Sequence, residues 1–276
     1  MELTSYASHT TFFKNVQKRT ENNMTDLKNK IALVTGASSG IGRATAELLS
    51  DAGCKLILAA RRKERLIELA KTLASECYLI ELDVRNREEV DKVVESLPKQ
   101  FQDIDILVNN AGLGRGLAKL HEGNPEGWDE MIDTNVKGLL YVSKAVIPGM
   151  VARGRGHIIN IGSIAGHEVY PGGNVYCATK HAVDAITKGM LIDLVDTPIR
   201  VSTVDPGLVE TEFSQVRFYG DTEKAKKTYQ GIKALTPHDI AEAVVWIAQR
   251  PAHVQIAQMI IFPTAQGSTM VTHKVQ

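Results

Sequence analysis

The sequence has few cysteines, no excess of charge of either sign and no long hydrophobic run. Its three cysteines, Cys54, Cys77 and Cys177, show no metal-ligand spacing, and any disulfide scheme would leave one of them unpaired. We therefore expect no metal site and a reduced, cytoplasmic compartment.

Charge and hydropathy exclude two further classes of protein. Lys plus Arg and Asp plus Glu both number 32, so the chain has no bulk electrostatic attraction for nucleic acid or anionic membranes. No apolar run approaches the ~20 residues that a membrane-spanning helix needs. We expect neither nucleic acid nor membrane as a partner.

The beginning of the chain differs in composition from the rest. Residues 1–26 are polar, rich in Ser and Thr, and lack the apolar segment of a secretion signal. This predicts a disordered N-terminal extension, with Met24 as an alternative natural start. We expect residues 27–276 to form one domain, because no repeat, linker or low-complexity block divides them.

From residue 30 onward, short apolar segments alternate with segments of helical periodicity. The predicted strands are 31–35, 56–60, 77–82, 104–109, 157–161, 201–205 and 258–262. The predicted helices are 43–52, 62–74, 87–97, 128–153, 174–195 and 237–249. This alternation is typical of an α/β protein, and we predict a single Rossmann-like, doubly wound parallel sheet of about seven strands with helices on both faces. The polar segment 208–231 interrupts the alternation just after a strand, and we expect it to be a lid over the ligand site.

The first predicted strand leads into its helix through a glycine-rich turn, Thr35-Gly36-Ala37-Ser38-Ser39-Gly40-Ile41-Gly42. Glycines permit a tight turn and close backbone approach, and a helix N-terminus favours a phosphate. We therefore expect the stretch from Gly36 to Ile41 to bind a dinucleotide. The spacing G-x-x-x-G-x-G fits the general fingerprint loosely, so simple strand–helix punctuation is the alternative.

Two arginines, Arg61 and Arg62, follow the second strand about twenty residues beyond the glycines. An NAD site usually has an acid there, whereas the 2′-phosphate of NADP calls for a cation. The pair therefore favours NADP as cofactor, since guanidinium also suits phosphate geometry. The alternative is a solvated pair at a helix start.

Polar and glycine residues stand where the other strands end, at the edge where such a sheet binds its ligand. The candidates there are Asp83 and Val84, Asn110-Ala111-Gly112, Ser163, and Pro206-Gly207. Each is also an ordinary turn or capping residue type. Asn135, inside a helical pattern, is either exposed or marks a kink that holds a water near the reacting centre.

Tyr176 and Lys180 are four residues apart in a predicted helix and therefore share one face. A phenol has a pKa near ~10, and lowering it to about 7 needs roughly 4 kcal/mol of preferential support for the phenolate. The Lys180 ammonium is a candidate source of that support. Such a Tyr could exchange a proton with an alcohol or carbonyl oxygen.

Together these motifs resemble the short-chain dehydrogenase/reductase family from about Lys30 to Pro263. The resemblance implies Tyr176 as general acid/base, Ser163 as partner of the substrate oxygen, and Lys180 as phenol tuner and nicotinamide-ribose ligand. It also implies Asn135 as anchor of a water in a proton relay. Two departures are Gly162, where Ser is common, and Thr179, which replaces a frequent Ser.

The far half of the chain is similar to the NADP-dependent 3-hydroxy acid dehydrogenase branch, which includes serine and allo-threonine dehydrogenases. Members also reduce semialdehydes and are usually homotetramers. The similarity lies in the segment 206–214 and in Arg217, Ala225, Tyr229 and residues 260–264. It implies that the cofactor is wrapped by a set of residues in the first of these segments: Pro206, Gly207, Leu208, Val209, Thr211 and Phe213.

Our leading hypothesis is reversible oxidation by NADP of a small 3-hydroxy acid: L-serine, L-allo-threonine, 3-hydroxypropionate or 3-hydroxyisobutyrate. An acidic substrate needs a cationic anchor, for which Arg217 is the first candidate and Arg115 the second. The alternative for each of them is a surface charge. The alternatives are reduction of a 3-oxoacyl carrier-protein thioester or of a sulfonated aldehyde, and an NADPH-sensing regulator without turnover.

Overall fold

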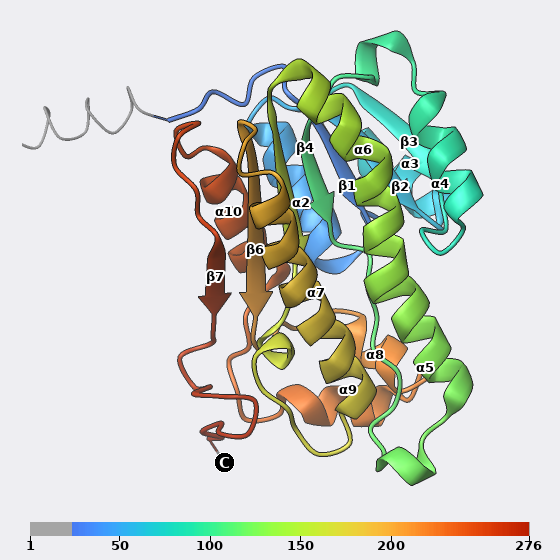
Figure 1. Ribbon diagram of the computed structural model, residues 1–276. Coiled ribbons are helices and arrows are strands. Elements are labelled where there is room, and N and C mark those ends of the chain that lie inside the picture. Colours follow the sequence, from blue (N-terminus) through green and yellow to red (C-terminus); the bar gives the residue numbers. More distant parts are fainter. Residues whose placement is uncertain (1–23, 276) are drawn as a thin grey trace, which may run out of the picture.

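The computed structural model describes residues 24–275 (Figure 1). Most of the predicted N-terminal extension, residues 1–23, lies outside the described residues. Thr25 donates through its backbone N–H to the Gln249 carbonyl (2.8 Å) and through its hydroxyl to the Arg250 carbonyl (2.8 Å). The folded domain therefore begins at or before Thr25.

Seven parallel strands form one sheet in the order β3-β2-β1-β4-β5-β6-β7. They are β1 Ile31–Thr35, β2 Lys55–Ala60, β3 Cys77–Glu81, β4 Ile104–Asn109, β5 Gly156–Ile161, β6 Ile199–Pro206 and β7 Gln258–Ile261. The central strands are buried almost along their whole length, which explains their continuous apolar sequences. The strand order reverses between β1 and β4, so the crevice for a ligand is expected at their carboxyl ends. The predicted doubly wound sheet is confirmed.

Helices cover both faces of the sheet (Figure 1). One buried cluster packs α2, α3 and α10 against the first face, and a second packs α4, α6 and α7 against the other. These helices are α2 Gly40–Asp51, α3 Lys63–Thr72, α4 Arg87–Glu95, α6 Leu139–Arg153, α7 Asn174–Asp193 and α10 Pro237–Ala248. Short 3-10 turns lie at η1 Lys99–Phe101, η2 Leu120–Glu122 and η4 Ile164–Gly166.

The helix predicted over 128–153 is not continuous. It consists of α5 Pro125–Ile132, a π-helical turn η3 Asp133–Gly138, and α6. Asn135 lies in the π-helical turn and is 2 % exposed, so the interpretation as an exposed helical Asn is wrong. Such π-helical turns are frequent at functional sites.

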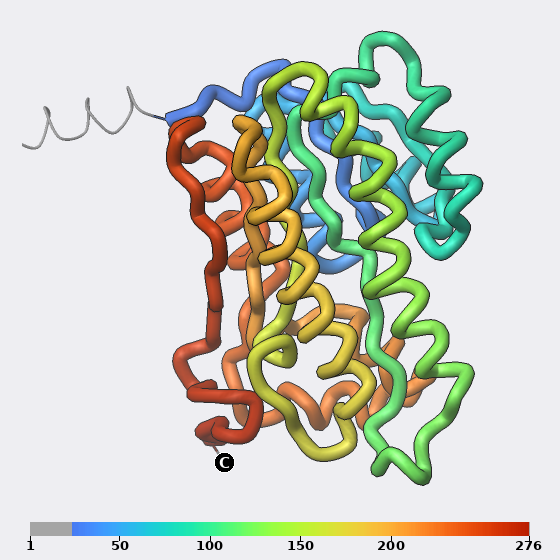
Figure 2. The backbone as a smooth tube through the Cα atoms, viewed as in Figure 1, coloured from blue at the N-terminus to red at the C-terminus, as the bar shows by residue number. Residues whose placement is uncertain are grey.

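The segment 208–231 contains two short helices, α8 Phe213–Arg217 and α9 Thr222–Tyr229. Figures 1 and 2 show both helices at the end of the molecule toward which β6 and β7 point. The segment therefore covers the sheet edge where the crevice is expected. No helix among residues 24–275 has the length and apolar character needed to cross a bilayer.

Candidate active site

A cavity of about 510 Å³ lies at the carboxyl ends of the strands. Almost every predicted site residue lines it. These are Gly36, Ser38, Ser39, Ile41, Arg61, Arg62, Asp83, Val84, Asn110, Ala111, Gly112, Ser163, Tyr176, Lys180, Pro206, Gly207, Leu208, Val209, Thr211, Phe213 and Arg217. Four do not line it: Ala37 is fully buried in the core, Gly40 begins α2, Asn135 lies behind the wall, and the second anchor candidate Arg115 also lies outside it.

The glycine-rich turn is closed by Asn110, whose side-chain amide donates to the carbonyls of Thr35 (2.9 Å) and Gly36 (3.3 Å). Gly36 has a φ of +66°, and a Cβ at this position would lie 2.8 Å from the Asn110 amide nitrogen. Only glycine therefore fits at Gly36 without strain. The turn leads directly into the N-terminus of α2, whose first backbone N–H groups suit a phosphate.

Arg62 lies beside this turn. Its guanidinium donates to the hydroxyls of Ser39 (2.8 Å) and Ser38 (3.2 Å) and to the carboxylate of Glu212 in the lid segment (2.9 Å). The cation and two hydroxyls form a donor set that fits a phosphate group. Arg61 is half-exposed, and its nearest anion is Glu130, at 3.9 Å. Sequence reasoning missed Glu212, because it follows Arg62 by 150 residues in the chain.

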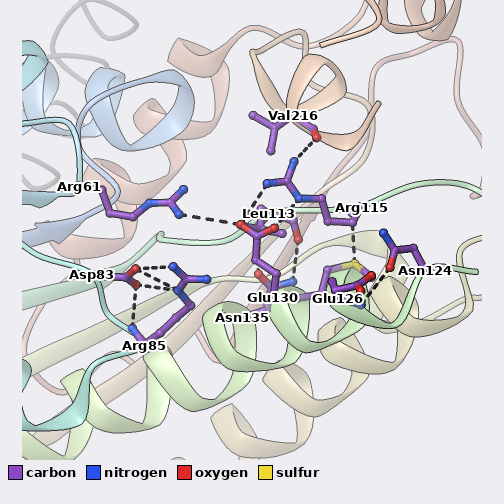
Figure 3. A network of polar contacts seen from close by, with 11 residues as sticks. Arg61, Asp83, Arg85, Leu113, Arg115, Asn124, Glu126, Glu130, Asn135 and Val216 are labelled. Carbon is purple, nitrogen blue, oxygen red and sulfur yellow. Dashed lines mark hydrogen bonds and ion pairs between the residues drawn. The ribbon is translucent and has the colours of Figure 1, made fainter. Parts of the chain in front are cut away.

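Asp83 lines the cavity, but its carboxylate already has a partner (Figure 3). It accepts from the Arg85 guanidinium (2.6 Å) and the Arg85 backbone N–H (3.1 Å). The side-chain hydrogen bond with Arg85 holds the pKa of Asp83 below its usual value. This geometry favours the interpretation of Asp83 as a turn residue.

Tyr176 and Lys180 face the cavity from α7, and both are at least nine-tenths buried. The Lys180 Nζ donates to the Ile161 carbonyl (2.9 Å), and burial lowers the pKa of Lys180 to about 8, with the Asp205 charge opposing this. Burial also raises the pKa of the Tyr176 phenol, against the expectation of a lowered one. The largest opposing influence on the phenol is the Arg217 charge, followed by the neighbouring Ser163 hydroxyl. The expectation is wrong here because desolvation outweighs both of them.

Ser163 lies two residues after the end of β5 and caps the 3-10 turn η4, where its hydroxyl accepts from the Ala165 backbone N–H (3.1 Å). Gly162, the departure from the family pattern, has a structural reason. A Cβ there would overlap the Asp205 carboxylate, which is 2 % exposed and accepts from the Thr203 hydroxyl (2.6 Å). The sequence signal that could have identified the buried Asp205 carboxylate is the position of this acid directly before Pro206.

The Arg217 guanidinium stacks over the Tyr176 ring, with its Cζ 4.6 Å from the ring centroid, and donates to the Tyr170 hydroxyl (2.9 Å). Its Nε is buried, with no hydrogen-bond partner among the residues that the structure describes. A half-buried cation that lines the cavity beside the reactive Tyr fits an anionic ligand group. Tyr170 was missed because it lies in a loop without periodicity.

Arg115, the second anchor candidate, does not line the cavity. Figure 3 shows it held by Glu130 of α5 and by the Val216 carbonyl.

Figure 3 also shows Asn135 bonded to Leu113. The Asn135 amide makes three hydrogen bonds in all, two to the Leu113 backbone (2.8 Å each) and one to the Thr179 hydroxyl (3.0 Å). Among residues 24–275, no group of three or more acidic, His or Cys side chains is arranged to hold a metal ion.

This fold and this arrangement of Ser, Tyr and Lys define a class of protein. The family model described as short chain dehydrogenase matches residues 30–220, and the chain belongs to that family.

Within the family, three known proteins are especially similar. The chain is 52% identical over 238 residues to the NADP-dependent 3-hydroxy acid dehydrogenase YdfG of Salmonella typhimurium, covering 86% of this chain and 96% of that protein. It is 46% identical over 258 residues to the NADP-dependent 3-hydroxy acid dehydrogenase of Schizosaccharomyces pombe, covering 92% and 100%. A solved closed form of serine dehydrogenase complexed with NADP+ superposes with a TM-score of 0.85 at 48% identity, covering 89% of this chain and 100% of that chain.

Proposed function

We propose that this protein is an NADP-dependent dehydrogenase that reversibly oxidises a small 3-hydroxy acid or reduces the matching semialdehyde. The observation that carries the proposal is the Arg217 guanidinium, which lines the cavity and stacks on the Tyr176 ring. A carboxylate bound there would bring a hydroxyl two carbons away toward Tyr176 and Ser163. The family and the similar 3-hydroxy acid dehydrogenases support the same reaction.

The cavity wall suits the cofactor along its length. The glycine turn and the N-terminus of α2 would hold its phosphates, and Arg62 with Ser38 and Ser39 would bind its 2′-phosphate. The other residues proposed to contact it are Ala37, Gly40, Ile41, Arg61, Asp83, Val84, Asn110, Ala111, Gly112, Tyr176, Lys180, Pro206, Gly207, Leu208, Val209, Thr211 and Phe213. NADP supplies the hydride acceptor when it is bound.

Residues of this chain accept the proton of the substrate hydroxyl and hold the oxygen that loses it. Tyr176 takes the substrate hydroxyl proton, and Ser163 hydrogen-bonds the same oxygen. Arg217 and Ser163 both favour the ionised phenol, while Lys180 contributes a buried cation one helical turn away. The role of Asn135 as anchor of a relay water stays a prediction. Its side chain already joins the Leu113 backbone to α7.

The charges around the cavity narrow the substrate class. Among the described residues that line it, the only carboxylates are Asp83 and Glu212. Asp83 is paired with Arg85, and Glu212 with Arg62 and Arg65. Neither carboxylate is left to pair with a substrate ammonium group. We therefore expect a higher kcat/KM for 3-hydroxypropionate and 3-hydroxyisobutyrate than for L-serine or L-allo-threonine.

The test measures NADP reduction with these four acids and with propan-1-ol, in the wild type and in Arg217→Ala. A lost hydrogen bond to a charged group is worth about 1.5–3 kcal/mol, so KM for the hydroxy acids should rise by roughly tenfold to a hundredfold. KM for propan-1-ol should stay unchanged. Absence of turnover with every hydroxy acid would refute the proposal, and activity on a 3-oxoacyl thioester or a sulfonated aldehyde instead would support the alternatives.

A cytoplasmic homotetramer is part of the proposal, and it rests on family likeness and on the cysteine content. Size-exclusion chromatography with light scattering would test the assembly.

A further inference from the structure

Arg115 and Glu130 form an ion pair beneath the lid segment (Figure 3). The Arg115 Nε and Nη2 donate to the two carboxylate oxygens of Glu130 at 2.6 and 3.0 Å. Both side chains are about four-fifths buried, at 18% and 21% exposed. The hydrogen bond from Arg115 is the first cause of the lowered pKa of Glu130. The pair is therefore bidentate and shielded from water, unlike an ordinary surface ion pair.

The third nitrogen of this guanidinium bonds to the lid segment. The Arg115 Nη1 donates to the Val216 carbonyl (2.5 Å), and the Gly116 backbone N–H donates to the Arg217 carbonyl (2.8 Å). Both carbonyls belong to the last residues of α8, which has five residues. A helix this short has no stability of its own, so its position depends on these contacts. A cation at its C-terminus also satisfies carbonyls that lack helical partners.

The same loop contacts the Arg217 side chain. A Cβ on Gly114 would lie 2.8 Å from the Arg217 Nε and 2.9 Å from the Phe213 ring. The loop 114–116 therefore contacts both the backbone and the side chain of Arg217.

We propose that Arg115 and Glu130 are positioning residues that hold the C-terminal end of α8 and so fix Arg217 over the Tyr176 ring. The proposal rests on the proposed function, in which Arg217 binds the substrate carboxylate. Arg115 is not itself an anchor, because its guanidinium is engaged by Glu130 and Val216 and lies outside the cavity wall.

Glu130 also lies 3.9 Å from Arg61, but Arg61 is 54% exposed. This contact is long and screened by water, so it contributes little. The loss of Glu130 should therefore affect the substrate much more than NADP, which makes KM for NADP an internal control.

The experiment uses Glu130→Gln, which keeps the side-chain size, and Arg115→Lys, which keeps the charge without the fork. Asp129→Asn is the matched control, because it removes the same charge from an exposed neighbour on α5. For each variant, KM and kcat are measured for 3-hydroxypropionate, propan-1-ol and NADP. Calorimetric titration with malonate gives a carboxylate affinity without turnover.

We expect Glu130→Gln to raise KM for 3-hydroxypropionate and Kd for malonate at least tenfold, with Arg115→Lys affected less. KM for propan-1-ol and KM for NADP should stay within about twofold of the wild type. Adding Glu130→Gln to Arg217→Ala should cause no further loss of malonate affinity, because the positioned group is already gone.

Three results would each overturn the positioning role: equal rises of KM for the acid and the alcohol, unchanged constants in both Glu130→Gln and Arg115→Lys, or multiplicative effects on malonate affinity in the double variant. Arg115→Lys alone decides the question if Glu130→Gln does not fold. If Arg217→Ala itself leaves KM for 3-hydroxypropionate unchanged, the anchor of the proposed function is wrong. If Glu130→Gln leaves KM for 3-hydroxypropionate unchanged while Arg217→Ala raises it, only the positioning proposal is overturned.

Discussion

Replacement of Lys180 by Met should make the free energy of unfolding vary less with pH in the alkaline range. Lys180 is 8% exposed, and burial lowers its pKa from 10.5 to about 8. Each pKa unit corresponds to about 1.4 kcal/mol, so holding the buried ammonium costs roughly 3 kcal/mol of folding free energy.

The sign follows from proton binding in the two states. Below pH 8 the folded and unfolded chains both hold the Lys180 proton, and the full cost applies. Between about pH 8 and 10.5 the unfolded chain still binds the proton while the folded one releases it, so stability rises with pH. Above that window the cost is gone. The wild type should therefore gain about 2 kcal/mol relative to Lys180→Met between roughly pH 7.5 and 9.5.

The assay is urea unfolding of both proteins at several pH values across this window. Other titrating groups occur in both proteins, so their contributions cancel in the difference. The absolute difference at neutral pH should be small, because Met also removes the hydrogen bond to the Ile161 carbonyl, worth about 1–3 kcal/mol if that carbonyl stays unpaired. Parallel pH profiles for the two proteins would refute the reasoning, since Lys180 would then keep its ordinary pKa.

Three further changes probe the site. Tyr176→Phe should lower turnover at least about a hundredfold in an NADP-reduction assay, and near-normal turnover would contradict its acid/base role. Arg62→Ala should raise KM for NADP at least about tenfold with NAD kinetics unchanged, because it removes the proposed 2′-phosphate ligand. Arg65→Ala, which removes only a lid contact with Glu212, is the control for that loss. Gly162→Ala should lower the free energy of unfolding by about 1–3 kcal/mol, because its Cβ overlaps the buried Asp205 carboxylate. An unchanged urea midpoint in Gly162→Ala would mean that this carboxylate moves aside freely.

The sequence determined the sheet. The apolar segments matched the strands to within two residues at each end, because strands covered on both faces must be apolar along their whole length. The same local logic brought Tyr176 and Lys180 to one face of α7, since four residues are about one helical turn. The glycine turn also lies where its neighbours in the chain indicate.

The helix predicted over 128–153 shows where local periodicity fails. Its apolar spacing carries no sign of the π-helical turn, in which Asn135 bonds the Leu113 backbone and Thr179. Those partners are 22 and 44 residues away, so only the folded chain brings them to Asn135.

Tertiary structure alone decided which charged side chains line the cavity and which are paired outside it. Arg115 and Arg217 were both candidate anchors in the sequence, yet Arg115 is bound by Glu130 whereas Arg217 lines the cavity and stacks on Tyr176. The sequence also predicted a lowered phenol pKa from Lys180, whereas burial raises it and the Lys180 amine donates to Ile161. Secondary structure follows from the order of neighbouring residues, but the pKa and the partner of a charge depend on desolvation and on groups that the fold brings together from other segments of the chain. The fold can therefore be predicted from the chain, and the electrostatics of the site cannot.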